Sequence, residues 1–104
     1  MTVLLAAVAC GPPDWDAYED ERIGLVCERT FECYDAEELD ALGMSDVDTC
    51  EAAYRALAAA DDEEESCDYK AAAAGTCLRD IEDQTCEAFT ADIEPVSCGE
   101  VCGE

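Results

Sequence analysis

The residues with the greatest chemical potential in this chain are its nine cysteines. Thiols form disulfides, bind metals or act as nucleophiles, and their spacing helps to separate these uses. Structural zinc and iron–sulfur sites use closely spaced pairs, typically C-x2-C. Only Cys98 and Cys102 approach that pattern, and the chain contains no histidine. We therefore expect disulfides, and neither a metal site nor a cofactor.

An odd number of cysteines in an exported protein leaves one thiol to be explained. Cys10 stands apart because it directly follows an apolar run that ends in small residues. If Cys10 is modified, eight cysteines are left for four disulfides, and eight cysteines allow 105 connectivities. The eight are Cys27, Cys33, Cys50, Cys67, Cys77, Cys86, Cys98 and Cys102.

The first ten residues have the pattern of an export signal. Their apolar stretch is far shorter than the roughly 20 residues needed to span a bilayer. The segment Ala7-Val8-Ala9-Cys10 resembles the lipobox of bacterial lipoproteins, with Gly11 as the next residue. The resemblance implies a signal peptide over residues 1–9 that is cleaved before Cys10, and acyl chains on Cys10 that bind a membrane.

No Lys or Arg precedes Cys10, so we expect the printed start to truncate this signal peptide. The alternative is an uncleaved apolar segment in which Cys10 is an ordinary thiol. Residues 10–14 contain two prolines after the cysteine and predict a short extended tether. The disulfide-rich domain is expected over residues 15–104.

Residue types suited to catalysis are scarce. The absence of histidine removes the usual general base, and no C-x-x-C motif is present for thiol–disulfide exchange. Lys70 is the only lysine, and Ser45 and Ser66 are expected to cap helices. We predict that the protein is not an enzyme and has no small-molecule substrate.

Carboxylates are abundant but do not form a recognisable metal motif. Asp14 with Asp16, and Asp46 with Asp48, begin like calcium-binding loops. Neither continues to the glycine and the final glutamate that such loops require. The run at residues 61–65 is the densest charge in the chain and is expected to be solvated.

The formal net charge is −23, from 28 acidic and 5 basic side chains. Such a chain lacks the cations that neutralise phosphates, which argues against direct binding to nucleic acid and opposes binding to anionic lipid head groups. Self-repulsion also opposes compaction. Disulfides are therefore expected to supply much of the stability of a domain this small.

Apolar periodicity predicts helices at residues 16–34, 35–42, 45–60 and 67–83, and a further helical turn at residues 86–89. Pro95 is expected to end regular structure, leaving residues 97–104 as a tail. The fold class is all-α, a small disulfide-stapled antiparallel helical bundle with three main helices plus short helical turns. We favour a bond between Cys33 and Cys50, because both are expected at the same end of the bundle.

The segment Cys27–Cys33, with the sequence CERTFEC, is followed by amphipathic helices that each carry single cysteines. This arrangement resembles small cysteine-rich predicted lipoproteins common in myxobacterial genomes. That resemblance implies no mechanism, since those families have no assigned activity.

These observations predict a lipid-anchored, extracytoplasmic protein, in the periplasm or at the cell surface, with a structural or binding role. The membrane is its expected partner through Cys10, and no protein partner is identifiable. Two alternatives stay open: an acidic cytoplasmic mimic of nucleic acid, and a secreted inhibitor or toxin-like protein without lipid. Cytoplasmic disulfides are rare, which counts against the mimic.

Overall fold

The computed structural model describes residues 12–59 and 67–103. Cys10, the signal segment, Ser66 and the acidic run at 61–65 lie outside these residues. Within them the chain forms helices and one pair of very short strands: α1 (Trp15–Cys33), α2 (Ala36–Ala41), α3 (Val47–Ala59), β1 (Asp68–Tyr69), α5 (Ala71–Asp83), α6 (Cys86–Thr90), α7 (Val96–Gly99) and β2 (Cys102–Gly103).

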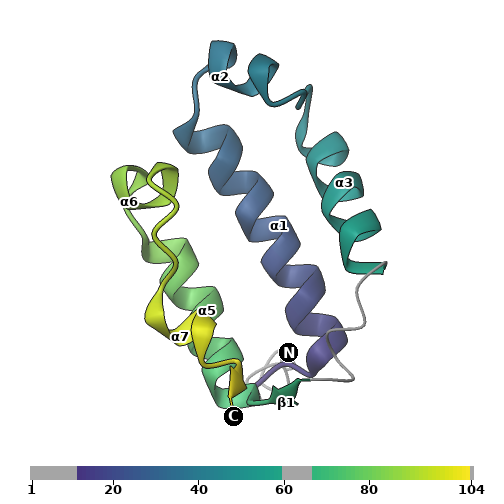
Figure 1. Ribbon diagram of the computed structural model, residues 1–104, viewed down its shortest axis with the longest axis vertical. Coiled ribbons are helices and arrows are strands. Elements are labelled where there is room, and N and C mark those ends of the chain that lie inside the picture. Colours follow the sequence, from purple (N-terminus) through teal and green to yellow (C-terminus); the bar gives the residue numbers. More distant parts are fainter. Residues whose placement is uncertain (1–11, 60–66, 104) are drawn as a thin grey trace, which may run out of the picture.

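Helix α1 lies in the middle of the molecule, with α3 along one flank and α5 along the other (Figure 1). The chain runs along α1, returns along α3 and runs along α5 in the same direction as α1. The molecule is therefore flat, 41 × 40 × 25 Å. The expected all-α, disulfide-stapled bundle with three main helices is confirmed.

Carboxylate side chains cap the N-termini of the first two helices. The Asp14 side chain accepts a hydrogen bond from the Ala17 backbone N–H at 2.9 Å, which caps α1. Asp35 and Glu38 form a reciprocal capping box at α2. These bonds satisfy backbone donors that lack partners within the helix, so each acidic residue fixes where its helix starts.

Helix α3 is capped by Asp46 and not by Ser45, contrary to the sequence-based expectation. The Asp46 carboxylate accepts the Thr49 backbone N–H at 2.7 Å, and this bond lowers the pKa of that carboxyl. The Ser45 hydroxyl instead lies 3.1 Å from the Thr49 hydroxyl. An ionised acceptor binds a backbone donor more strongly than a hydroxyl does, which favours Asp46 as the cap.

The helix expected at residues 67–83 begins later, at Ala71. Asp68 and Tyr69 are extended and pair antiparallel with Gly103 and Cys102. The disulfide between Cys67 and Cys102 joins the same two segments. Pairing between distant parts of the chain therefore overrides the local helical pattern here.

The expectation that Pro95 ends regular structure was wrong. Pro95 occupies the N-cap position of α7, where its fixed φ and missing N–H are compatible with a helix start. The hydroxyl of the buried Ser97 in α7 donates to the Asp80 carboxylate of α5 at 2.7 Å. The C-terminal segment is thus attached to α5 by packing and hydrogen bonding.

Two small apolar clusters lie on the two flanks of α1. On the α5 side the buried residues are Tyr18, Ala74, Cys77, Leu78, Ile81 and Val101. On the α3 side they are Ile23, Cys27 and Cys50. No buried residue belongs to both clusters, so α1 supports two separate thin cores.

Four disulfides connect the eight described cysteines. They join Cys27 to Cys50, Cys33 to Cys86, Cys67 to Cys102 and Cys77 to Cys98.

The favoured bond between Cys33 and Cys50 was wrong. Helix α2 and the turn after it occupy the space beyond the end of α1, so Cys50 comes level with Cys27 and not with Cys33. Cys27 is six residues earlier on α1, which corresponds to about 9 Å along a helix. Cys33 instead bonds to Cys86 at the start of α6.

Candidate functional site

The cysteines chosen from the sequence form the framework of the domain and leave no described thiol free for chemistry. Cys27, Cys50 and Cys77 are fully buried. Four disulfides place this chain in a non-reducing, extracytoplasmic setting. A candidate site must therefore be sought in the surface that this framework shapes.

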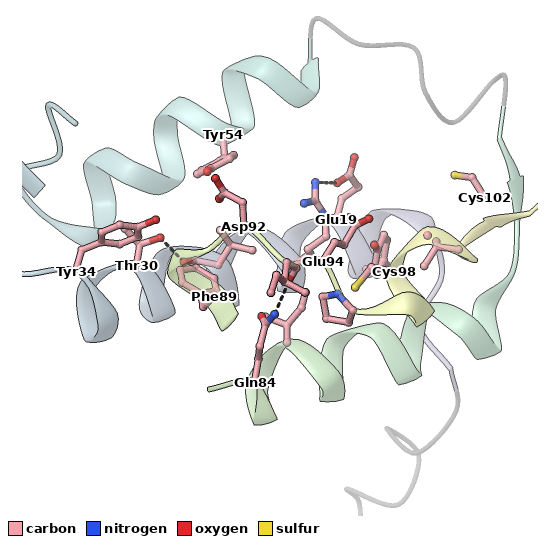
Figure 2. Close-up of a pocket in the computed structure, with 18 of the residues that line it drawn as sticks. Glu19, Thr30, Tyr34, Tyr54, Gln84, Phe89, Asp92, Glu94, Cys98 and Cys102 are labelled. Carbon is pink, nitrogen blue, oxygen red and sulfur yellow. Dashed lines mark hydrogen bonds and ion pairs between the residues drawn. The ribbon is translucent and has the colours of Figure 1, made fainter. Parts of the chain in front are cut away.

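An open groove of about 710 Å³ follows the face of α1 between its two flanks (Figure 2). Its floor is a single stripe of the helix, spaced by three to four residues as one face of a helix requires. The α1 residues in this stripe are Trp15, Tyr18, Glu19, Arg22, Val26 and Thr30, and Tyr34 follows at the end of the helix.

One wall of the groove is Tyr54 of α3, and the opposite wall is the segment from Phe89 to Pro95. Side chains from the helices beneath hold this second wall in place. The Gln84 side-chain amide donates to the Ile93 carbonyl, and the Arg29 guanidinium donates to the Gln84 carbonyl. Arg29 also lies 5.8 Å from the centre of the Phe89 ring, a favourable cation–π distance.

Three aromatic residues and a carboxylate line one end of the groove. Tyr54 points toward Asp92 across the groove, with Phe89 and Tyr34 beside them (Figure 2). The Tyr34 and Phe89 ring centres are 6.3 Å apart in an edge-to-face arrangement. We call these residues, Tyr34, Tyr54, Phe89 and Asp92, the aromatic–aspartate pocket.

The surroundings of Tyr34 raise the pKa of its hydroxyl. Burial is the main cause, and the negative charges of Asp92 and Glu38 raise the pKa further, with a smaller contribution from Tyr54. Tyrosine is uncharged at neutral pH even at its ordinary pKa of about 10, so Tyr34 presents an uncharged ring with a polar O–H. A site of aromatic faces beside a carboxylate favours a cation.

The backbone of Asp92 is unusual. Its φ of 61° places it in the left-handed region, which residues other than glycine rarely adopt. The Ile93 N–H bonds to the Ala88 carbonyl and the Asp92 N–H to the Phe89 carbonyl, both at 3.1 Å. These bonds form a Schellman motif at the end of α6, in which Asp92 takes the place usually held by glycine.

The opposite end of the groove is also aromatic. The Trp15 and Tyr69 ring centres are 5.5 Å apart and nearly perpendicular, and Tyr18 lies 6.0 Å from Trp15. The Tyr69 hydroxyl donates to the Pro13 carbonyl, and burial raises the pKa of Tyr69, assisted by the charge of Asp14. Trp15 thus packs among side chains that fasten the start of the domain to β1.

Two exposed apolar side chains line this groove. Among the described residues, four large hydrophobic side chains are strongly exposed: Leu42 (54%), Leu57 (67%), Ile93 (60%) and Val96 (81%). Leu42 and Ile93 line the groove. Large exposed apolar side chains beside a groove are typical of a contact surface.

The carboxylates at which calcium-like patterns begin are used otherwise. Asp14 and Asp46 each cap a helix through a backbone N–H. Across residues 12–59 and 67–103, no group of three or more acidic or cysteine side chains is arranged to hold a metal ion. No helix in that part of the chain is both long and apolar enough to cross a membrane.

Sequence reasoning did not identify the groove. Neither Tyr34 and Tyr54 nor Asp92 stands out in the sequence as a binding residue. The one local signal is the place of Asp92, two residues after a short helix, because many helices end at this position with a left-handed residue. The Cys33–Cys86 bond joins α6, and the wall that follows it, to the end of α1, and no local pattern indicates this long-range link.

The comparisons with known proteins add no functional assignment. No family model, no curated protein and no solved structure matches this chain.

Proposed function

We propose that this protein is a lipid-anchored, acidic extracytoplasmic domain that acts by binding and not by catalysis. In this proposal the signal segment is removed before Cys10, acyl chains on Cys10 insert into the membrane, and the disulfide-bonded domain projects from it. Two or more acyl chains anchor a protein stably where one does not.

The observation that carries this proposal is the count of cysteines. Eight of the nine are joined in four disulfides within the domain. Only Cys10 is left over, and it is the cysteine in the lipobox-like segment. Acylation of this sulfur would remove the odd thiol, which would otherwise form unwanted disulfides in an oxidising compartment.

The position of Pro13 gives the proposed anchor an orientation. Pro13 lies beside β1 and the start of α5, because it accepts the Tyr69 hydroxyl and a side chain at Gly75 would approach its ring. Helices α2 and α6 lie at the opposite end of the domain (Figure 1). With Cys10 in the membrane, the aromatic–aspartate pocket would lie at the end away from the lipid.

A binding role is supported by what lines the groove. Its lining combines aromatic rings, aliphatic side chains and carboxylates, and its volume falls within the roughly 300–1,000 Å³ of ligand sites. With no histidine in the chain and the eight cysteines of the domain oxidised, the usual pairs of nucleophile and general base are missing from it.

Intact mass spectrometry of the protein from native membranes tests the anchor. The expected result is loss of residues 1–9, added acyl mass on Cys10, no alkylation before reduction and eight alkylated cysteines after it. A free thiol at Cys10 would contradict the proposal. Recovery without acyl mass in the medium would support the secreted alternative, and recovery from the cytoplasm the nucleic-acid mimic.

Fractionation of two variants separates loss of lipid from loss of fold. Cys10→Ser should move the protein from the membrane to the soluble fraction. The double variant C33S/C86S removes a disulfide but leaves Cys10, and it should stay with the membrane. Release of both variants to the same extent would mean that folding, and not acylation, holds the protein there.

A further inference from the structure

We infer that the groove binds an amphipathic helix that carries lysine or arginine side chains, contributed by a partner protein. This deepens the proposed binding role by naming the class of partner, and it does not depend on the lipid at Cys10. It rests on the shape of the groove, the apolar side chains exposed around it and the charge of its rim.

The shape of the groove suits a helix. Its floor is one stripe along α1, a helix of 19 residues, which is about 28 Å long. Helices α3 and α5 lie along the two flanks of α1, and the groove follows the stripe of α1 between them. A further helix laid along the stripe would complete a bundle in which α1 is covered on three sides.

The apolar content of the groove offers such a helix a surface to bury. Val26 and Met44 lie within it, and the exposed Leu42 and Ile93 stand at its edges. Burying an aliphatic side chain contributes about 1.5–3 kcal/mol relative to leaving it in water. One face of the occupant should therefore be aliphatic.

The charge of the groove indicates which side chains the bound helix should carry beside its aliphatic face. Its lining carries the carboxylates of Glu19, Asp92 and Glu94, and Arg22 is the only basic residue in that lining. Arg22 is already paired with Glu19 at 3.2 Å. The carboxylates of Asp92 and Glu94, both on the same wall, are left facing a ligand.

The net charge of −23 disfavours acidic occupants of this surface. A second copy of the chain, a nucleic acid or an anionic lipid surface would each be repelled. A basic helix is attracted by the whole molecule and more strongly by this rim. Charge complementarity therefore selects a cationic partner.

The aromatic–aspartate pocket gives one basic side chain a defined place. An ammonium or guanidinium group in this pocket would lie beside the Asp92 carboxylate and near the aromatic rings that line it. Cation–π contacts contribute about 0.5–2 kcal/mol, more where water is excluded. Tyr34 is uncharged at neutral pH, as tyrosine is at its ordinary pKa, and its raised pKa extends that state to higher pH.

The sole tryptophan of the chain, Trp15, lines the groove and serves as a built-in reporter. The test uses the oxidised full chain with Cys10→Ser, which needs no detergent. It is titrated with a synthetic peptide of about 14 leucine and lysine residues, about four helical turns, patterned to form an amphipathic helix. We expect a saturable change in Trp15 fluorescence, one-to-one stoichiometry by calorimetry, and weaker binding as salt is added.

Matched charge variants locate the site. D92N/E94Q removes two carboxylates from the groove rim and should weaken peptide binding about threefold to tenfold. E21Q/E28Q removes the same charge from the exposed back of α1, where both residues line a different hollow, and should change binding less than twofold. Ile93→Ser keeps the backbone hydrogen bonds of Ile93 and changes only a side chain that is 60% exposed; it should weaken binding about tenfold.

Three results would overturn the inference: no saturable binding of the leucine–lysine peptide, equal binding of a matched peptide with glutamate in place of lysine, or equal weakening by E21Q/E28Q and D92N/E94Q. Any of these together with acylated Cys10 would leave the anchor proposal standing. Peptide binding together with a free thiol at Cys10 would support the binding inference and contradict the anchor proposal.

Discussion

At the scale of single residues, two helix ends with the same hydrogen bonds carry different residues. Gly43 ends α2 with a φ of 75°, and Asp92 ends α6 with a φ of 61°. In both turns the residue after the left-handed one donates its N–H to a carbonyl in the last turn of the helix. Met44 donates to Leu39 at 3.0 Å, and Ile93 donates to Ala88 at 3.1 Å. Glycine adopts this backbone freely, whereas aspartate is strained there. The left-handed residue that ends α6 therefore also supplies a carboxylate to the lining of the groove.

Opposite substitutions at these two ends should have opposite effects on stability. Asp92→Gly relieves the backbone strain and should raise the free energy of unfolding by up to about 1 kcal/mol. Gly43→Ala should lower it by about 1 kcal/mol, because a side chain there meets nothing within 4 Å and only the backbone conformation opposes it. Urea denaturation of the oxidised chain measures both.

A loss of stability in Asp92→Gly would mean that the Asp92 carboxylate stabilises the fold. A gain in stability that accompanies weaker peptide binding would show a residue kept for function at the expense of folding.

At the scale of elements, the sequence predicted the helices better than their partners. Residues 16–34 and 35–42 were assigned within one residue or so, because capping carboxylates, apolar spacing and Gly43 are local signals. The start of α5 and the existence of α7 were missed. The start of α5 depends on the pairing of Tyr69 with Cys102, which are far apart in the sequence. Helix α7 is held by the hydrogen bond from Ser97 to Asp80 of α5.

The disulfide pairing shows the same limit. Cys27 and Cys50 lie among regularly spaced apolar residues of their helices, a spacing that indicates side chains directed toward the core, and both are buried there. The choice of Cys33 for Cys50 relied on the assumption that consecutive helices meet end to end. Helix α2 breaks that assumption, and no local pattern shows how far it displaces α3.

Differences in exposure should order the reduction of the disulfides. Cys86 is exposed, whereas Cys27 and Cys50 are completely buried. A reductant needs access to sulfur, so the Cys33–Cys86 bond should be reduced first and the Cys27–Cys50 bond last. Limited reduction, alkylation and peptide mass mapping establish the order.

Early loss of Cys33–Cys86 should be costly. This bond spans 53 residues, the longest separation of the four, and closing such a loop is worth about 4 kcal/mol in the chain-entropy model. Its reduction should free the α6 wall of the groove. Reduction of the buried pair before this one would contradict the order derived from exposure.

At the scale of the whole molecule, covalent links compensate for a thin core and a large charge. The sequence predicted this balance, since composition alone gives the net charge and the cysteine count. It did not predict the groove, because a groove arises from how α3 and α6 are held apart on α1. That separation is set by the Cys27–Cys50 and Cys33–Cys86 bonds together.

Salt should therefore act strongly on the reduced chain and weakly on the oxidised one. With the bonds broken, repulsion among the carboxylates opposes helix packing, and added salt screens it. We expect helical circular dichroism of the reduced protein near body temperature to be low and to rise with salt. The oxidised protein is the control and should change little. A reduced protein insensitive to salt would show that charge does not limit its folding.

The two buried clusters on either side of α1 have a consequence for motion. They share no buried residue. Helix α3 is joined to α1 by one disulfide, at Cys50 in its first turn, and by the exposed ion pair of Arg55 with Asp20. We expect the backbone amides of α3 beyond Cys50 to exchange with solvent hydrogen before those of α5, which carries more buried side chains. Tyr54 lies in that part of α3, so any outward movement there would widen the groove from one side.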